Sequence, residues 1–222
     1  MTATDPDDGA PARPSGADPS GDGDVDMDAL YGLLADRRCR DVLTYLREAG
    51  GTATFAGAVA HLADGDRSRV AAALCHACLP RLRAAGAVET EGGRIELTPP
   101  AALEWLLAWS GSVRDAPSGR SLGEWFSLLR DGRRRRVLGL LREHNVLSLG
   151  DAAEEIAVEE RGEPITAIPR QEVLDVYFSL YHDHVPRLAD AGVIEYDQES
   201  DTLAIDRTSL PVSLPGVPDA RN

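Results

Sequence analysis

Three thiols and one nearby imidazole are the side chains of this 222-residue chain best placed for metal or redox chemistry. Cys75 and Cys78 are three residues apart, so one face of a helix would present both of them. Cys39 and His61 could in principle join them, yet no second Cys pair completes a closed zinc site. We therefore interpret Cys75 and Cys78 as buried core thiols, and a redox or metal sensor is the alternative.

The sequence contains no arrangement of residues that is typical of an enzyme. There is no Gly-rich phosphate loop and no Ser/His/Asp grouping with a family context. His182 and His184 are two residues apart and so lie on different faces of a helix, which makes them a poor metal pair. We therefore expect no catalytic site, no metal site and no cofactor.

Two blocks of sequence each occur twice, in the same order. Residues 36–48 (DRRCRDVLTYLRE) return as residues 131–143 (DGRRRRVLGLLRE). Residues 76–89 (HACLPRLRAAGAVE) return as residues 182–195 (HDHVPRLADAGVIE). Separated blocks that repeat in one order indicate two copies of one small domain.

Each copy predicts a first helix, a short strand, two further helices and a hairpin with a Gly-rich or polar turn. The expected elements are, in the first copy, a single helix from residue 28 to 49, a strand at 52–55, helices at 56–63 and 68–85 and a hairpin over 87–98; in the second copy, a single helix at 122–143, a strand at 146–148, helices at 149–158 and 170–191 and a hairpin over 193–206. Eleven extra residues in the second copy are expected in the loop before its third helix. Pro80 and Pro186 lie inside the third helices, where we expect a kink or a break.

These boundaries predict five segments. They are a disordered acidic tail (1–27), a first domain (28–99), a short helix and linker (100–121), a second domain (122–207) and a disordered tail (208–222). The tails are rich in Asp, Pro, Gly and Ser and have little to bury. Trp105 and Trp109 of the short helix are expected to pack against a domain or a twin chain; a ligand-binding box is the alternative.

The order of elements resembles a winged helix-turn-helix. Residues 184–195 (HVPRLADAGVIE) are similar to the end of the recognition helix and the first wing strand of arsenic-repressor-type regulators. The chain as a whole resembles an uncharacterised family from halophilic archaea built from one or two such domains. The resemblance covers residues 28–98 and 122–206. It implies a mainly α fold with small β wings (α+β), in tandem copies, and DNA binding or protein docking as the function.

The outer face of the third helix differs between the copies. In the first copy Arg69, His76 and Arg83 stand among small residues, which suits contacts with phosphates or base edges; an ordinary solvated face is the alternative. In the second copy the outward residues Phe178, Ser179 and Ala189 follow an Asp and suit a protein contact better. We interpret the run of arginines at 133–136 as a solvated, salt-bridged face, although it could pair phosphates.

Charge supports this division of roles. The chain has no Lys, and its formal net charge is −14, which opposes non-specific contact with anions. Residues 29–99 carry +1 and residues 122–207 carry −8. The Lys-free, acidic, Ala- and Gly-rich composition resembles that of proteins from extremely halophilic archaea.

Three Cys residues fit a reducing compartment, and the polar, acidic start does not resemble a signal peptide. No apolar run approaches the ~20 residues of a membrane span. We therefore expect a cytoplasmic protein with no membrane partner. The function we predict is a transcriptional regulator that binds double-stranded DNA through the first domain and forms a homodimer or senses a signal through the second. The alternative is a protein-interaction module that does not bind DNA.

Overall fold

The computed structural model describes residues 26–112 and 119–205. The chain divides into two compact units, Met1–Asp115 (unit 1) and Ala116–Asn222 (unit 2). Each unit is mostly helical and contains one small antiparallel sheet, so the fold is of the α+β class. The tails predicted to be disordered lie outside the described residues, except for Asp26 and Met27, where the first helix begins.

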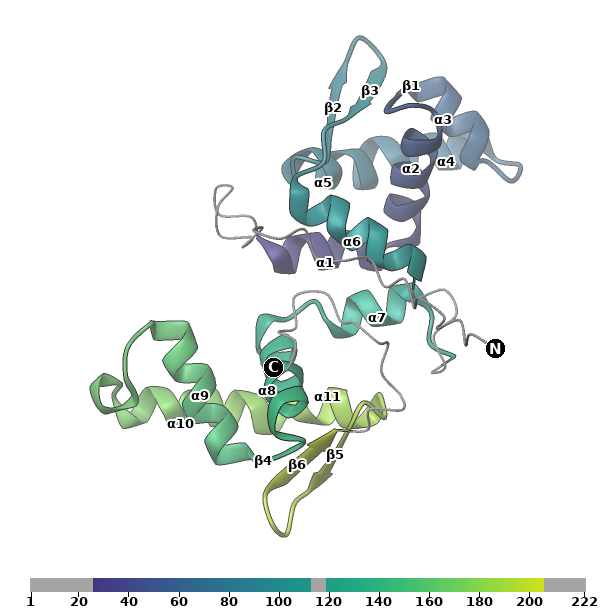
Figure 1. Ribbon diagram of the computed structural model, residues 1–222. Helices are drawn as coiled ribbons and strands as arrows, with labels where there is room; N and C mark the ends of the chain where they lie inside the picture. The colour runs from purple at the N-terminus through teal and green to yellow at the C-terminus, as the bar shows by residue number, and fades with distance from the viewer. Residues whose placement is uncertain (1–25, 113–118, 206–222) are drawn as a thin grey trace, which may run out of the picture. The chain divides into compact units, whose positions relative to one another are not determined.

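Unit 1 contains a three-stranded antiparallel sheet in the order β1-β3-β2, and the hairpin β2–β3 projects beyond its helices (Figure 1). The hairpin turns at Gly92-Gly93, where both residues have positive φ, as a two-residue turn of this kind requires. The elements of unit 1 are α1 (Met27–Ala35), α2 (Arg37–Glu48), β1 (Thr52–Thr54), α3 (Phe55–Leu62), α4 (Arg67–Ala73), a π-helical turn (Leu74–Cys78), α5 (Leu79–Ala84), β2 (Val88–Glu91), β3 (Arg94–Leu97) and α6 (Ala101–Ser112).

Unit 2 repeats the order of elements from α1 to β3, with an added 3₁₀ turn before its third helix and a sheet in the order β4-β6-β5. Its insertion relative to unit 1 is not confined to a loop as predicted, because α9 has 13 residues and α3 has 8. The elements of unit 2 are α7 (Leu122–Leu128), α8 (Gly132–His144), β4 (Val146–Ser148), α9 (Leu149–Arg161), a 3₁₀ turn (Ile165–Ala167), α10 (Arg170–Ser179), a π-helical turn (Leu180–His184), α11 (Val185–Asp190), β5 (Ile194–Asp197) and β6 (Thr202–Ile205).

The prediction of one long first helix in each unit is wrong, because the chain bends at an aspartate. Asp36 has extended backbone angles and its side chain accepts a hydrogen bond from the Arg38 N–H, so it caps the start of α2. Asp131 caps α8 in the same way through the Arg133 N–H. An Asp at this position satisfies an N–H group that the first turn of a helix leaves free.

An arginine, partly buried in unit 1 and buried in unit 2, stabilises the other side of each bend. In unit 1 the Arg40 guanidinium donates to the carbonyls of Leu34 and Ala35, at the end of α1. In unit 2 Arg135 donates to the carbonyls of Leu129 and Arg130, at 2.7 and 3.0 Å. These carbonyls lie in the last turn of a helix or just after it and have no partner within the helix. The cation therefore satisfies them and is attracted to the negative end of the helix dipole.

The hydrophobic residues predicted for the first helix are in the core. Tyr31 is fully buried with them, as are Leu74 and Leu82 of the third helix and Ile95 of β3. The confirmed residues are Leu30, Leu33, Leu34, Val42, Leu43 and Leu46. In the short helix α6, Trp109 is buried and Trp105 is partly exposed. Within residues 26–112 and 119–205, no helix is both long enough and apolar enough to cross a membrane.

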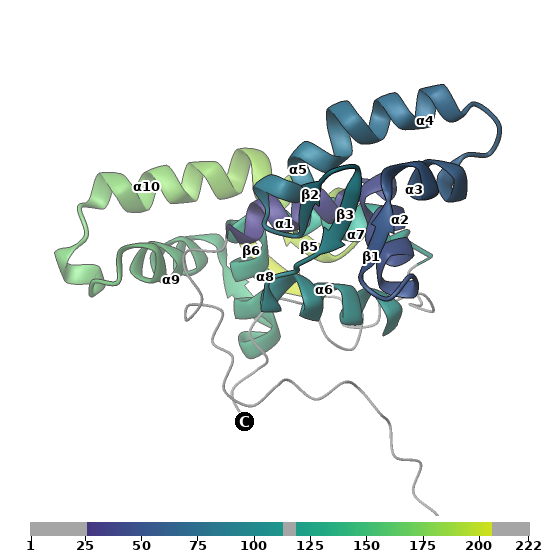
Figure 2. The ribbon, with the colours of Figure 1, turned by 90° about the horizontal axis from the view of Figure 1, so that it is seen from above.

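The third helix of each unit, residues 67–84 and 170–190, runs through its proline without a break. Figure 2 shows α4 and α5 of unit 1 as one continuous helical ribbon. A π-helical turn precedes the proline in both: Leu79 N–H bonds to the Leu74 carbonyl, and Val185 N–H to the Leu180 carbonyl. The wider turn adds one residue and absorbs the proline that would otherwise clash with the carbonyl four residues before it. The helix is therefore locally widened instead of broken.

His184 lies in the π turn of unit 2 and is buried. Its Nε2 is 2.9 Å from the Ser179 hydroxyl, and its Nδ1 lies 3.6 Å from an Asp131 oxygen and 3.5 Å from an Asp183 oxygen. Burial lowers the pKa of His184, although the two aspartates oppose this effect; the nearby Arg134 and Arg133 add to it. The imidazole is therefore neutral in the folded protein at neutral pH.

Arg135, the buried arginine of the bend in unit 2, should matter more for stability than its partly exposed neighbour Arg136. We expect Arg135→Ala to lower the free energy of unfolding by about 2–3 kcal/mol, because two carbonyls lose a charged donor. Arg136 forms ion pairs with Glu159 and Glu160 at 3.2 Å on the surface, so the control Arg136→Ala should cost about 1 kcal/mol or less. Equal losses in chemical denaturation would contradict this role of Arg135.

The buried imidazole should make the folded state sensitive to acid. As the pH falls below the ordinary His value of 6.5, the unfolded chain takes up a proton that folded His184 resists, so stability is lost. We expect the Tm to fall more for the wild type than for His184→Gln between about pH 7.5 and about pH 5.5. Glutamine can keep the bond to Ser179 and does not titrate. Parallel pH profiles of the two proteins would show that His184 does not contribute.

Candidate nucleic-acid interface

The third helix of unit 1 is strongly basic. Residues 67–84 contain four arginines and neither Asp nor Glu. The helix starts at Asp66, whose side chain accepts a hydrogen bond from the Arg69 N–H at 3.1 Å. The inner side of the helix is buried and consists of Leu74, Cys78, Leu79 and Leu82. The packing therefore turns the other side, with most of the charge, to the solvent.

All three residues predicted to contact DNA are exposed. The side chains of Arg69, His76 and Arg83 make no hydrogen bond or ion pair with the described part of the chain. Arg81 differs, because its guanidinium binds the Asp36 carboxylate at 3.0 Å and the Gly32 carbonyl at 2.7 Å. Arg69 and Arg83 therefore keep their donors available for an anionic partner, whereas Arg81 ties the helix to the bend between α1 and α2.

The end of this helix and the hairpin strand β2 form an open groove of about 790 Å³. Arg83 contributes the positive charge of the groove, and Glu89 and Glu91 of β2 contribute two negative charges. Neither glutamate forms an ion pair with Arg83 within the described residues. Phosphates would be attracted to the helix side of this groove and repelled from the strand side. The other lining residues are Pro80, Ala84, Val88 and Thr90.

The matching helix of unit 2 has a different surface. Residues 170–190 contain four acids and two arginines. By the alignment of the two repeats, Asp175 takes the place of Arg69, Phe178 that of Ala72 and Ala189 that of Arg83. Half of the Phe178 side chain is exposed. The charges on this helix disfavour a polyanion, and an exposed aromatic ring favours an apolar partner.

Phe178 belongs to a larger aromatic surface made by Tyr177, Phe178, Tyr181, His182 and Tyr196. The rings are in contact: the centroids of Phe178 and His182 are 6.2 Å apart, and those of Tyr181 and His182 are 4.9 Å apart. The ring of Tyr181 also lies edge-on to that of Tyr196 in β5. The aromatic surface therefore joins the third helix of unit 2 to its hairpin.

Asp201 links two tyrosines of the aromatic surface through hydrogen bonds. It accepts hydrogen bonds from the hydroxyls of Tyr177 at 3.1 Å and Tyr196 at 2.7 Å. Desolvation and the nearby carboxylate raise the pKa of both phenols, so they stay neutral. This cluster is not among the residues predicted from the sequence, although it contains three of the five tyrosines of the chain. The concentration of tyrosines in one repeat was the available signal.

Two of the three residues predicted for a protein contact are not fully on the surface. Ser179 is partly buried because its hydroxyl bonds to His184, so the prediction that it points outward is wrong. Ala189 is also partly buried. The π turn changes the helical phase between Phe178 and Ala189, so regular 100° steps do not give their positions.

The arginine run 133–136 is occupied within unit 2. Arg133 pairs with Glu160 through two 2.9 Å bonds, and Arg136 pairs with Glu159 and Glu160. Arg134 and Arg135 are buried and donate to backbone carbonyls around the end of α7. These contacts agree with the salt-bridged interpretation of the run, except that the middle two arginines are inside the unit.

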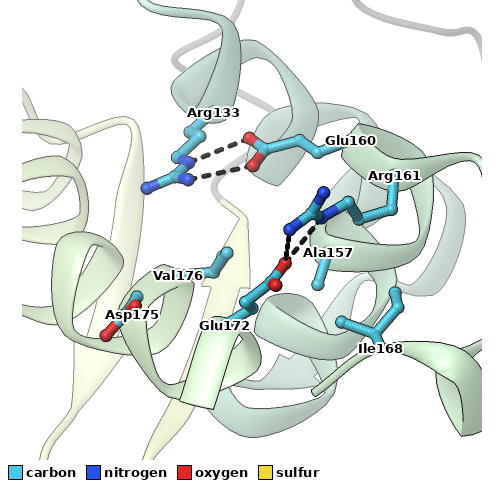
Figure 3. Close-up of a pocket in the computed structure, with 8 residues that line it drawn as sticks. All are labelled: Arg133, Ala157, Glu160, Arg161, Ile168, Glu172, Asp175 and Val176. Atoms are coloured by element: carbon cyan, nitrogen blue, oxygen red, sulfur yellow. Dashed lines mark hydrogen bonds and ion pairs between the residues drawn. The ribbon is translucent and has the colours of Figure 1, made fainter. Parts of the chain in front are cut away.

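Figure 3 shows a pocket of about 440 Å³ in unit 2, between α8, α9 and α10. Its floor is apolar (Ala157, Ile168 and Val176), and its rim carries the pairs Arg133–Glu160 and Arg161–Glu172. Each guanidinium already binds a carboxylate, and Asp175 accepts a bond from Gln171 at 3.0 Å. The rim therefore stabilises the contact of the helices and offers no unpaired cation to an anionic ligand.

The cysteines are arranged differently from the prediction. Cys75 is exposed, because the π turn leaves residues 75–77 on the surface, so the prediction that it is buried beside Cys78 is wrong. Cys78 is buried against Cys39 of α2, with 3.1 Å between the two Sγ atoms. His61 does not join them and instead stacks on Tyr45. No group of three or more His, Cys, Asp or Glu side chains among residues 26–112 and 119–205 could hold a metal ion.

Part of the chain is similar to a family without a known function. Residues 126–204, most of the described part of unit 2 and less than half of the chain, match the model of the family described as "Domain of unknown function (DUF7344)". No curated protein and no solved structure matches the chain. The second unit is thus similar to the members of that family.

Proposed function

We propose that the chain is a DNA-binding regulator built from two winged helix-turn-helix domains, with its DNA face on unit 1. The observation that carries this proposal is the third helix of unit 1, with four arginines, no acid and an exposed, unpaired Arg69 and Arg83. Helix, strand, two helices and a hairpin, with the first strand paired to the last, is the element order of such a domain.

In this proposal the third helix of unit 1 approaches the major groove. Arg69 and Arg83 contact phosphates or base edges, and His76 lies between them on the exposed π turn. Ala72 is exposed on the same helix and lets the backbone come close. The hairpin differs from a basic wing, because Glu89, Glu91 and Glu96 are exposed or partly exposed there and Arg94 is its only basic residue. The third helix of unit 1 therefore supplies the electrostatic attraction for DNA, and the acidic residues of the hairpin limit the affinity for DNA.

Removal of charges from the third helix and from the strand side of the groove tests this proposal in the intact protein. DNA fragments recovered with the tagged protein from its host serve as the probe in fluorescence anisotropy. We expect Arg69→Ala with Arg83→Ala to weaken binding by about tenfold or more and to reduce the salt dependence, because two phosphate contacts are lost. Glu91→Gln should strengthen binding, because it removes a repulsive charge beside Arg83.

The matched control is Arg38→Ala with Arg47→Ala, which removes the same charge from exposed positions on α2. It should change the affinity by much less than the third-helix pair. If both pairs weaken binding equally, the interaction depends on overall charge and not on this face. If the intact chain binds none of the recovered DNA, the result contradicts the DNA-binding proposal and favours the protein-interaction function.

A second function is favoured by the aromatic surface of unit 2. We propose that this surface joins two copies of the chain into a homodimer, as many regulators of palindromic sites require. An exposed Phe surrounded by Tyr and His rings has the composition of the core of a protein interface. Without DNA binding by unit 1, the same surface would make the chain a protein-interaction module.

The mass in solution tests the second function. We expect the wild type to scatter light as twice 23.8 kDa, and Phe178→Asp to shift it to the monomer, because a buried carboxylate would be unpaired. Ile165→Asp changes another exposed apolar residue outside the aromatic surface and should leave the dimer intact. A monomeric wild type, or a dimer that persists in Phe178→Asp, contradicts the assignment.

A further inference from the structure

We propose that Cys39 and Cys78 form a reversible dithiol–disulfide switch that ties the third helix of unit 1 to α2. The two Sγ atoms are 3.1 Å apart in the core of the unit. Cys39 lies in the first turn of α2, and Cys78 ends the π turn that also carries His76. A disulfide here would link two helices through cysteines that are 39 residues apart in sequence.

The comparison of the two units shows that the fold does not need this pair of thiols. By the alignment of the repeats, Arg134 takes the place of Cys39, and His184 takes the place of Cys78. Both replacements are buried and polar, and the Arg134 charge acts on the His184 imidazole. The same place in the scaffold therefore accepts quite different side chains, and the two facing thiols are a property of unit 1 alone.

The contact between the sulfurs gives the two thiols different roles. The Cys78 thiol donates to the Cys39 sulfur, and this bond lowers the pKa of Cys39 against the opposing effects of burial and Asp36. The same bond, with burial, raises the pKa of Cys78. Cys39 therefore has the greater thiolate character and is the sulfur that reacts first with an oxidant.

A small hydroperoxide is the class of oxidant that fits a buried pair, and it reaches the thiols through local opening of the unit. The Cys39 thiolate attacks the peroxide oxygen, breaks the O–O bond and becomes a sulfenic acid, while an alcohol leaves. The Cys78 sulfur then attacks the Cys39 sulfur, and the hydroxyl leaves as water with the Cys78 proton. In total, two thiols and one hydroperoxide give one disulfide, one alcohol and one water.

Bond formation must draw the sulfurs together by about 1 Å, since a disulfide is about 2 Å long. Because Cys78 is in the π turn, this movement pulls that turn toward α2 and away from the solvent. His76 is in the same turn, and Arg83 follows it on the same helix. We therefore expect oxidation to weaken DNA binding; this step rests on the proposed function, whereas disulfide formation does not.

Peptide mapping of the intact Cys75→Ser protein tests the disulfide itself. This variant removes the exposed third thiol, which shares a proteolytic peptide with Cys78. After treatment with a small hydroperoxide, we expect the protein to lose about 2 Da, the mass of two hydrogens. Cleavage after arginine without a reductant should give the dipeptide 39–40 joined to peptide 70–81, and dithiothreitol should separate them. The disulfide should also raise the Tm by about 5 °C or more.

Persistent free thiols at Cys39 and Cys78, under conditions that oxidise Cys75 in the wild type, would overturn the proposal. The same holds if the two peptides are never joined. Cys39→Ser in the Cys75→Ser background is the matched control and should show neither the mass loss nor the rise in Tm.

Anisotropy before and after oxidation tests the regulatory step in the Cys75→Ser protein. We expect the affinity for the recovered DNA to fall by about threefold or more on oxidation and to return with dithiothreitol, with no change in the Cys39→Ser control. A mapped disulfide with unchanged affinity refutes the regulation of DNA binding. A mapped disulfide in a chain that never binds DNA refutes the proposed function and leaves the redox site standing.

Discussion

The bend between the first two helices of each unit depends on an arginine, partly buried in unit 1 and buried in unit 2, that binds carbonyls at the end of the helix before it. Arg40 and Arg135 occupy the same position in the two repeats, four residues after the aspartate that caps the following helix. The aspartate starts the new helix, and the arginine satisfies the end of the old one. Together they fix the direction in which α2 or α8 leaves the bend. The third helix then packs on that helix, and in unit 1 Arg81 also ties it to Asp36.

The π turn is the second constraint on the third helix, and it has consequences for both proposed activities. By adding a residue before Pro80, it exposes Cys75, His76 and Ala77 in succession and turns Cys78 toward Cys39. In unit 2 the equivalent turn buries His184 and draws Ser179 inward. A proline that would interrupt a regular helix is thus accommodated by a local widening, and this widening decides which side chains face the core.

The two units use one scaffold for different surfaces. Both keep the aspartate of the bend, the arginine that binds the carbonyls before it, the π turn and the three-stranded sheet. Their third helices differ in charge, with four arginines and no acid in unit 1 and two arginines against four acids in unit 2. The aromatic surface of unit 2 contains Tyr177, Phe178 and Tyr196. This contrast supports the proposal that unit 1 meets a polyanion while unit 2 meets protein.

The sequence by itself determined the order of elements and most of the core. Repeated blocks and the 3.6-residue period of Leu30, Leu34 and Leu46 locate the helices and their buried side, because burial of apolar side chains follows local periodicity. The exposure of Arg69, His76 and Arg83 was also predicted from helical spacing. Their role in DNA binding stays a prediction.

Tertiary structure decided the features that depend on contacts between distant residues. The bend at Asp36 interrupts a continuous helical pattern in the sequence. It is stabilised by hydrogen bonds from an arginine to backbone carbonyls, which the hydrophobic period of the sequence does not reveal. An arginine at the same place in both repeats was the available signal. The π turn shifted the phase of the third helix, so Cys75 moved outward and Cys78 came to lie against Cys39. Tyr177 and Tyr196 meet at Asp201 only because the hairpin folds back on the helix. The periodicity of the sequence predicts that a helix has a buried and an exposed side, but packing decides which residues lie on each side.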